Sequence, residues 1–173
     1  MLFLIAVSVF AGTSVPSAEI IDRVVAVVSG QVITQSDVNA AIALGTADNL
    51  QEFIDRTLML NEVRRVAPPD PTPAEVQTHV ARMRARFASP AAFARALAAS
   101  GIEESAVTML AADDVRLAVY LDERFSAASQ PTDEEVRLAG DGARERLAAE
   151  RRQTLVSAWI AELRRRADIT VLR

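Results

Sequence analysis

Few residues of this chain are of a type that performs catalysis. The sequence contains a single histidine, His79, and no cysteine, which excludes thiolate chemistry and leaves too few ligands for a zinc or other soft-ligand site. His79 lies on the flank of an apolar helical stripe that includes Val76 and Val80, where we expect a structural or surface role. The phosphate-binding patterns GxxxxGK and GxGxxG do not occur. The sequence therefore predicts a non-enzymatic protein with no catalytic, cofactor-binding or metal-binding residues.

Acidic and arginine clusters are the remaining candidates for chemistry. Residues 133–135, Asp-Glu-Glu, follow Thr132 and are explained as a helix cap. The pair Asp113-Asp114 is expected to be solvated, with Asp114 at the edge of an apolar helix face and paired with an arginine, because a buried acid needs a partner. The arginine clusters are expected to form solvated helix faces. They are Arg64-Arg65, Arg151-Arg152 and Arg164-Arg165-Arg166.

Composition favours a helical fold. The 173 residues suffice for one domain with a hydrophobic core, or for a core with a small appendage. Half of the residues are apolar, but only 5% are aromatic and alanine is abundant, which favours helices packed through small residues over a β-sandwich. The formal net charge is −4, so the chain has no global attraction to nucleic acid or anionic lipid. All 19 basic residues are arginine, which we attribute to genomic base composition.

Residues 1–18 have the composition of an export signal. An apolar run from Leu2 to Ala11 is followed by small and turn-forming residues that end at Ala18, although the usual basic residues before the run are missing. A membrane span needs about 20 apolar residues, and Gly12 to Pro16 interrupts this run. A buried N-terminal helix and an uncleaved anchor are the alternatives. We expect an exported protein that is not stably inserted in a membrane.

A β-hairpin is predicted directly after this segment. Residues 24–28 are apolar and β-branched, and residues 31–34 resume an extended pattern after Ser29-Gly30, where Gly30 can supply the positive φ of a hairpin turn. Two strands alone are marginally stable in water. The one other strand-like run is at residues 168–172. We therefore expect the two ends of the chain to meet in one small antiparallel sheet.

Local signals predict seven helices between these ends. Gly45 and Gly101 are placed as C-terminal stops, and Thr72 with Glu75 forms a capping box with Pro73 at the first helical position. The helices are expected at residues 37–44, 47–66, 73–87, 90–100, 103–126, from 133 to about 139, and 143–167. The second of them is apolar on two sides and is predicted to be the central helix of the bundle.

Two proline-containing linkers lie at residues 67–73 and 127–131 of the mature chain, residues 19–173, and the second one separates two segments. The first, residues 19–130, contains the hairpin and five helices. The second, residues 131–173, contains the last two helices and the closing strand. We expect a groove to lie between the lobes that these segments form.

Three segments of the chain, in order, resemble a known family. IDRVVAVVSGQVITQSDV at residues 21–38 and WIAELRRRADITVL at residues 159–172 are similar to the opening and the closing helix and strand of the SurA family, periplasmic chaperones of outer-membrane protein biogenesis. TDEEV at residues 132–136 is similar to the segment that in this family leads into a parvulin-type prolyl isomerase domain. That domain would be expected near residues 140–142, and this chain has no room for it.

The resemblance implies a mainly α, SurA/trigger-factor-like chaperone core with a small antiparallel sheet formed by the N-terminal hairpin and the C-terminal strand. The implied function is that of an ATP-independent periplasmic holdase that binds unfolded outer-membrane proteins or aromatic-rich peptides through an apolar groove, with no cofactor, no nucleic-acid partner and no isomerase site. A non-catalytic scaffold with one fixed partner, or a homodimer, is the alternative function. Residual prolyl isomerisation is the third reading.

The candidate groove residues are adaptable apolar side chains, since methionine can repack around different partners. They are Met59, Met83, Phe87, Phe93 and Met109. The alternative for each is a place in the core, which the regular stripe around Met83 and Phe87 favours for those two. Met109 falls away from the main apolar face of its helix and is the best candidate for exposure.

Overall fold

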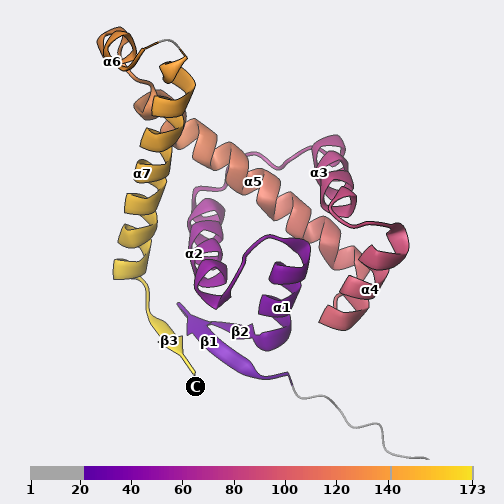
Figure 1. Cartoon of the computed structure of the whole chain (residues 1–173). Coiled ribbons are helices and arrows are strands. Elements are labelled where there is room, and N and C mark those ends of the chain that lie inside the picture. Colours follow the sequence, from indigo (N-terminus) through magenta and orange to yellow (C-terminus); the bar gives the residue numbers. More distant parts are fainter. Residues whose placement is uncertain (1–21, 141, 173) are drawn as a thin grey trace, which may run out of the picture.

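The two ends of the chain meet in a three-stranded antiparallel sheet. The computed structural model describes residues 22–140 and 142–172, so the expected export signal lies outside the described residues. Strand β1 (Val24–Val28) pairs with β2 (Gln31–Thr34) on one side and with β3 (Ile169–Val171) on the other, in the order β2-β1-β3. Ser29 and Gly30 form the hairpin turn with φ values of 50° and 83°. The predicted closure of the chain through one sheet is confirmed (Figure 1).

Seven helices join β2 to β3 within the described part of the chain, and the predicted mainly helical fold with a small sheet is confirmed. They are α1 (Gln35–Leu44), α2 (Leu50–Val66), α3 (Pro73–Ala85), α4 (Pro90–Ser100), α5 (Glu104–Ser129), α6 (Asp133–Ala139) and α7 (Ala143–Arg166).

Most helix boundaries follow the predicted caps. Gly45 and Gly101 end α1 and α4 in the left-handed conformation, and Thr72 and Thr132 form capping boxes at α3 and α6. Two starts differ from the prediction. Helix α1 is capped by Thr34 rather than by a residue after it, and α2 begins at Leu50 because the Asn49 side chain accepts a hydrogen bond from the Glu52 N–H.

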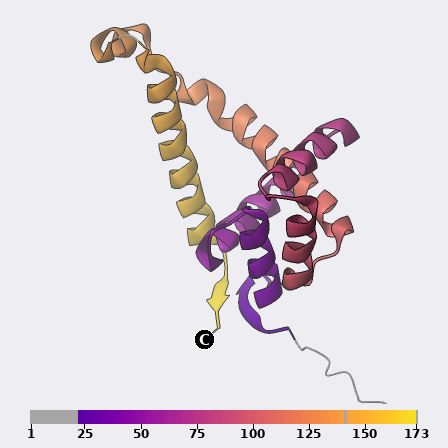
Figure 2. The same ribbon diagram turned by 45° about the vertical axis from the view of Figure 1, so that its right-hand side comes forward.

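The two longest helices, α5 and α7, lie close together near α6 and are farther apart at their other ends. Helix α5 runs from α4 to α6, and α7 returns from α6 to the sheet, so that both meet near α6 and diverge away from it (Figures 1 and 2). Helix α2 lies between them near the sheet and contacts α1, α5, α7 and β1. These contacts agree with the prediction that α2 is the central helix of the bundle.

Two hydrophobic clusters form the core, and α5 belongs to both. The first joins the sheet, α2, α7 and the C-terminal half of α5, where Trp159 packs against Tyr120 and Phe125 with ring centroids 5.6 and 5.8 Å apart. The second joins α3, α4, the end of α1 and the N-terminal half of α5. Its buried residues are Leu44, Val76, Val80, Met83, Phe93, Leu97, Val107 and Ala111.

The expected pairing of Asp114 with an arginine is confirmed, but the expectation that the Asp113-Asp114 pair is solvated is wrong, because both side chains form ion pairs. Asp114 accepts hydrogen bonds from the buried Arg56, at 2.5 Å from Nη2, and lies 3.1 Å from His79 Nε2. Asp113 forms ion pairs with Arg64 at 2.9 Å and with Arg116 at 3.1 Å. The two acids therefore connect α5 to α2 and α3, and His79, for which a structural or surface role was predicted, provides the contact from α3.

Candidate functional site

A pocket of about 600 Å³ lies between α1, α2 and the N-terminal half of α5. We call it the α1–α5 pocket. Helix α5 contributes Ala106, Met109, Leu110 and Asp113, which are spaced i, i+3, i+4 and i+7 and therefore share one helix face. The neighbouring residues Val107 and Ala111 point into the second core cluster. Helix α5 thus buries one face and presents another to the pocket.

Small side chains leave the space that the pocket occupies. Ala40 and Ala41 line the pocket from α1, and Phe53 lines it from α2. The turn after α4 adds Gly101 and Ile102. The volume is in the range of pockets that hold a drug-sized molecule or a few amino-acid side chains. The apolar part of the lining is suited to binding a large apolar side chain.

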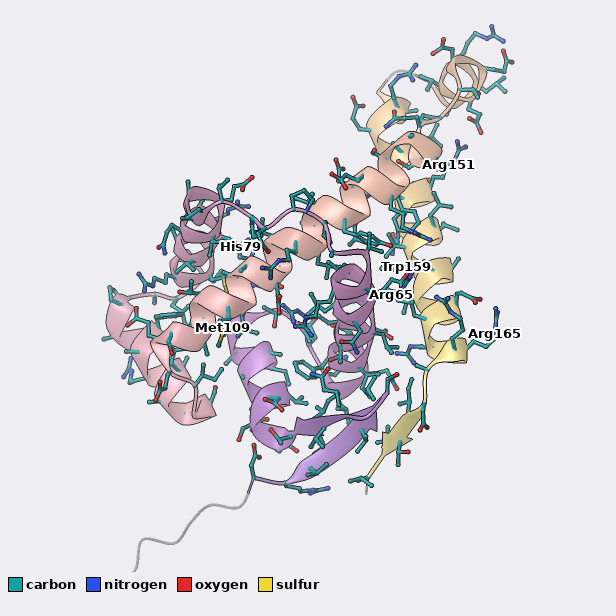
Figure 3. All side chains as sticks on the ribbon, turned by 180° about the vertical axis from the view of Figure 1, so that it is seen from behind. Arg65, His79, Met109, Arg151, Trp159 and Arg165 are labelled. Carbon is teal, nitrogen blue, oxygen red and sulfur yellow. The ribbon has the colours of Figure 1, made fainter. Side chains whose placement is uncertain are left out.

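Met109 is the most accessible apolar residue of this pocket. Its exposed fraction is 66%, which is high for a large hydrophobic side chain. It lies on α5 where that helix passes α1 (Figure 3). A flexible thioether at the rim can contact side chains of different shapes.

The pocket is more acidic than basic. Its lining contains three aspartates, Asp22, Asp37 and Asp113, and one arginine, Arg64. Asp22 accepts a hydrogen bond from the Ser36 N–H at 3.2 Å. The polar Thr34 side chain, followed by the hydrogen bonding of Ser36, lowers the pKa of Asp22 below its ordinary value. This carboxylate is therefore ionised at neutral pH.

A second hollow of about 620 Å³ lies where α3 ends and α4 begins. Phe87 and Phe93 line it, with ring centroids 5.2 Å apart in an edge-to-face arrangement. Arg84 lies 5.6 Å from the Phe93 ring centroid and forms an ion pair with Glu104 across the same hollow. Phe93 is 5% exposed and belongs to the second core cluster, so the hollow borders the core between α3 and α4.

The structure separates the five predicted groove residues. Met83 is 3% exposed and belongs with Phe93 and the half-buried Phe87 to the second core cluster. Met59 is half-buried against the first cluster. Within the described residues these side chains do not form one groove, and Met109 alone lies in the α1–α5 pocket.

Sequence reasoning missed the rest of the pocket. The site residues predicted from the sequence do not include Phe53, Leu110, Ile102, Asp22 or Asp37. The i, i+3, i+4, i+7 spacing on α5 could have predicted that the pocket residues of α5 share one helix face. The approach of α1 to that face could not be predicted, because residues 37 and 109 are far apart in the sequence.

The described residues offer little for catalysis. Within them, no cluster of three or more His, Cys, Asp or Glu side chains is arranged to hold a metal ion. His79 contacts Asp114, and no hydroxyl group of the described chain hydrogen-bonds to its ring. No helix in residues 22–140 and 142–172 has the length and apolarity needed to cross a membrane.

Comparison with models of known protein families gives no match for this chain, and comparison with curated protein sequences gives none either.

Proposed function

We propose that this protein is an ATP-independent periplasmic chaperone of the SurA type, which holds unfolded segments of outer-membrane proteins in the α1–α5 pocket and has no isomerase activity. The observation that carries the proposal is the pocket itself, whose lining is partly apolar and includes the two-thirds exposed Met109. A client segment that covers Met109 removes its apolar surface from water, which favours binding. The site needs neither a nucleotide nor a metal to do this.

The arrangement of the ends also supports a chaperone core. The resemblance to the SurA family implies that the first and last segments fold together, and β1 does pair with both β2 and β3. The resemblance also places an isomerase domain between α6 and α7. Here α6 ends at Ala139 and α7 begins at Ala143, a connection that holds no further domain.

The decisive experiment measures whether the purified protein prevents aggregation of a urea-denatured outer-membrane β-barrel protein after dilution. We expect suppression that increases with chaperone concentration and needs no ATP. The variant Met109→Asp places a charge at the pocket rim and should weaken client binding roughly tenfold. The matched control is Leu138→Asp on α6, where the native side chain is 77% exposed and does not line the pocket.

The results distinguish a chaperone that uses this pocket from a protein without chaperone activity. Suppression by the native protein and by Leu138→Asp, together with loss in Met109→Asp, supports the proposal. If the native protein neither suppresses aggregation nor binds the denatured client, the proposal is wrong. A proline-peptide assay should give no rate above background, and a rate above it would contradict the absence of isomerase activity.

A fixed-partner scaffold or a homodimer is the second candidate. The observation that favours it is the free edge of β3, where Val171 is 51% exposed and Leu172 is 43% exposed. An edge strand of this kind can pair with another strand. One stoichiometric partner in a crosslinking experiment, or a dimer in sedimentation, would favour this function over holding many clients.

A further inference from the structure

The charges of the α1–α5 pocket do not balance within its lining. Asp113 is paired with Arg64 and also with Arg116, so the arginine of the lining is already engaged. Asp22 and Asp37 remain, and both lie near the first turn of α1. The N-terminus of that helix offsets about half a unit charge. The α1 side of the pocket therefore carries a net negative charge.

Both carboxylates retain capacity to accept a further hydrogen bond. Asp37 accepts from the Thr34 N–H and hydroxyl through one oxygen, Oδ2, and no donor of the described chain bonds to its Oδ1. Asp22 accepts from the Ser36 N–H through Oδ1. Because a carboxylate has about four lone-pair positions, capping α1 does not use up either group. Each carboxylate can therefore accept a further hydrogen bond from a cationic group.

The large apolar side chains of the pocket and its two aspartates without an arginine partner, Asp22 and Asp37, lie on different elements. The apolar part comes mainly from Phe53, Ile102 and Leu110, with Met109 at the rim. The acidic part comes from the start of α1 and the residue two before β1. A ligand that satisfies both parts at once must carry a large apolar group and a cation a short distance apart.

We propose that this pocket selects extended peptide segments in which a large apolar side chain lies next to a lysine or arginine. The apolar side chain enters between α2 and α5, and the cation lies against Asp22 and Asp37. This inference rests on the proposed chaperone function and adds the class of segment that the chaperone prefers. Because the carboxylates are exposed at the mouth, the preference is electrostatic and salt-dependent.

The test uses three fluorescent peptides of equal length with the same aromatic residues, flanked by lysine, by glutamine or by glutamate. Binding to the full chain is measured by fluorescence anisotropy at low and at high ionic strength. We expect the lysine-flanked peptide to bind about threefold to tenfold more tightly than the glutamate-flanked one at low ionic strength, with the difference shrinking in high salt. Equal affinity of all three would overturn the selection while leaving the chaperone function standing.

Substitutions test whether the preference for cationic peptides arises in the α1–α5 pocket. Asp22→Asn keeps the shape of the side chain and should reduce the preference for the lysine-flanked peptide, whereas Asp133→Asn on α6, a 96% exposed acid, should leave it unchanged. Met109→Lys adds a cation at the rim without touching the α1 cap and should shift the preference toward glutamate flanks. Leu138→Lys is its control. A preference that survives both pocket variants would overturn the assignment to this pocket, and failure of every peptide to bind would overturn the chaperone function as well.

Discussion

The absence of a side chain at Gly45 allows Arg86, which follows α3, to contact the end of α1. Gly45 ends α1 with φ of 66°, and the Arg86 guanidinium lies where a Cβ atom would be, donating to the carbonyl oxygens of Leu44 and Gly45 at 3.1 and 3.0 Å. We expect Gly45→Ala to lose about 2 kcal/mol of unfolding free energy, from the left-handed backbone and the displaced arginine. Urea denaturation followed by circular dichroism measures this loss.

Gly101→Ala is the matched control for that substitution. Gly101 ends α4 with a similar φ of 68°, but no atom lies within 4 Å of an added Cβ. It should lose only the backbone contribution, about 1 kcal/mol. Equal losses in the two variants would show that Arg86 does not hold the end of α1.

Asp114 should contribute more to the stability of the fold than its neighbour Asp113, although both are acids on α5. The Arg56 side chain that pairs with Asp114 is 8% exposed, whereas the Arg64 side chain that pairs with Asp113 is 52% exposed. Asp114→Ala leaves a buried guanidinium without its carboxylate and should lower the unfolding free energy by about 3 kcal/mol. Asp113→Ala should cost about 1 kcal/mol or less. Chemical denaturation of the two variants checks this, and a similar loss in both would contradict it.

At the scale of elements, the α6 cap is held by a carboxylate whose ionisation depends on α7. The backbone N–H of Thr132, then the Arg151 side chain and the Thr132 hydroxyl, lower the pKa of Glu135. Its contribution to stability is therefore complete above the unfolded-state pKa and is lost as pH falls through the lower folded-state pKa. Arg151→Gln should raise the pKa of Glu135 part of the way to its ordinary value, because the Thr132 N–H still donates.

An NMR pH titration of the Glu135 side chain measures this shift directly. Arg152→Gln is the control, since Arg152 pairs with Asp122 instead. Both substitutions remove one positive charge from α7, but Arg152→Gln should leave the pKa of Glu135 nearly where it is. An equal shift in both variants would mean that the general charge of α7, and not the Arg151 contact, sets this pKa.

The elements that the sequence predicted correctly are those with local causes. The Thr72 and Thr132 capping boxes, the Gly45 and Gly101 stops and the Ser29-Gly30 turn each act within a few residues. The candidate site depends on contacts across long separations. Asp114 is 58 residues from Arg56, and no periodicity within α5 identifies that partner. The exposure of Met109 was predictable from its position on the helix, but the acidic wall opposite it was not.

At the scale of the whole molecule, β3 follows α7 and pairs with β1, which closes the fold. Residue pairs that exchange two hydrogen bonds alternate along an antiparallel ladder. The Leu172 N–H donates to the Val25 oxygen and the Ser29 N–H to the Asp168 oxygen. Val27 and Thr170, which lie opposite each other between these pairs, therefore also exchange hydrogen bonds. The N–H of Val171 faces outward from the free edge of the sheet.

Thr170→Pro should therefore weaken the closure of the molecule more than Val171→Pro does. Both variants place a proline in β3, but only the first removes an N–H that bonds β1. We expect Thr170→Pro to lower the unfolding free energy by about 2 kcal/mol, and Val171→Pro by about 1 kcal/mol or less. Urea denaturation monitored by the fluorescence of Trp159, which is buried on α7 against α5, measures both. Faster hydrogen exchange at β1 amides in Thr170→Pro alone would locate the loss in the sheet. Equal unfolding free energies for the two variants would show that pairing of β3 with β1 contributes little, and that α7 is held in place by its contacts with α2 and α5.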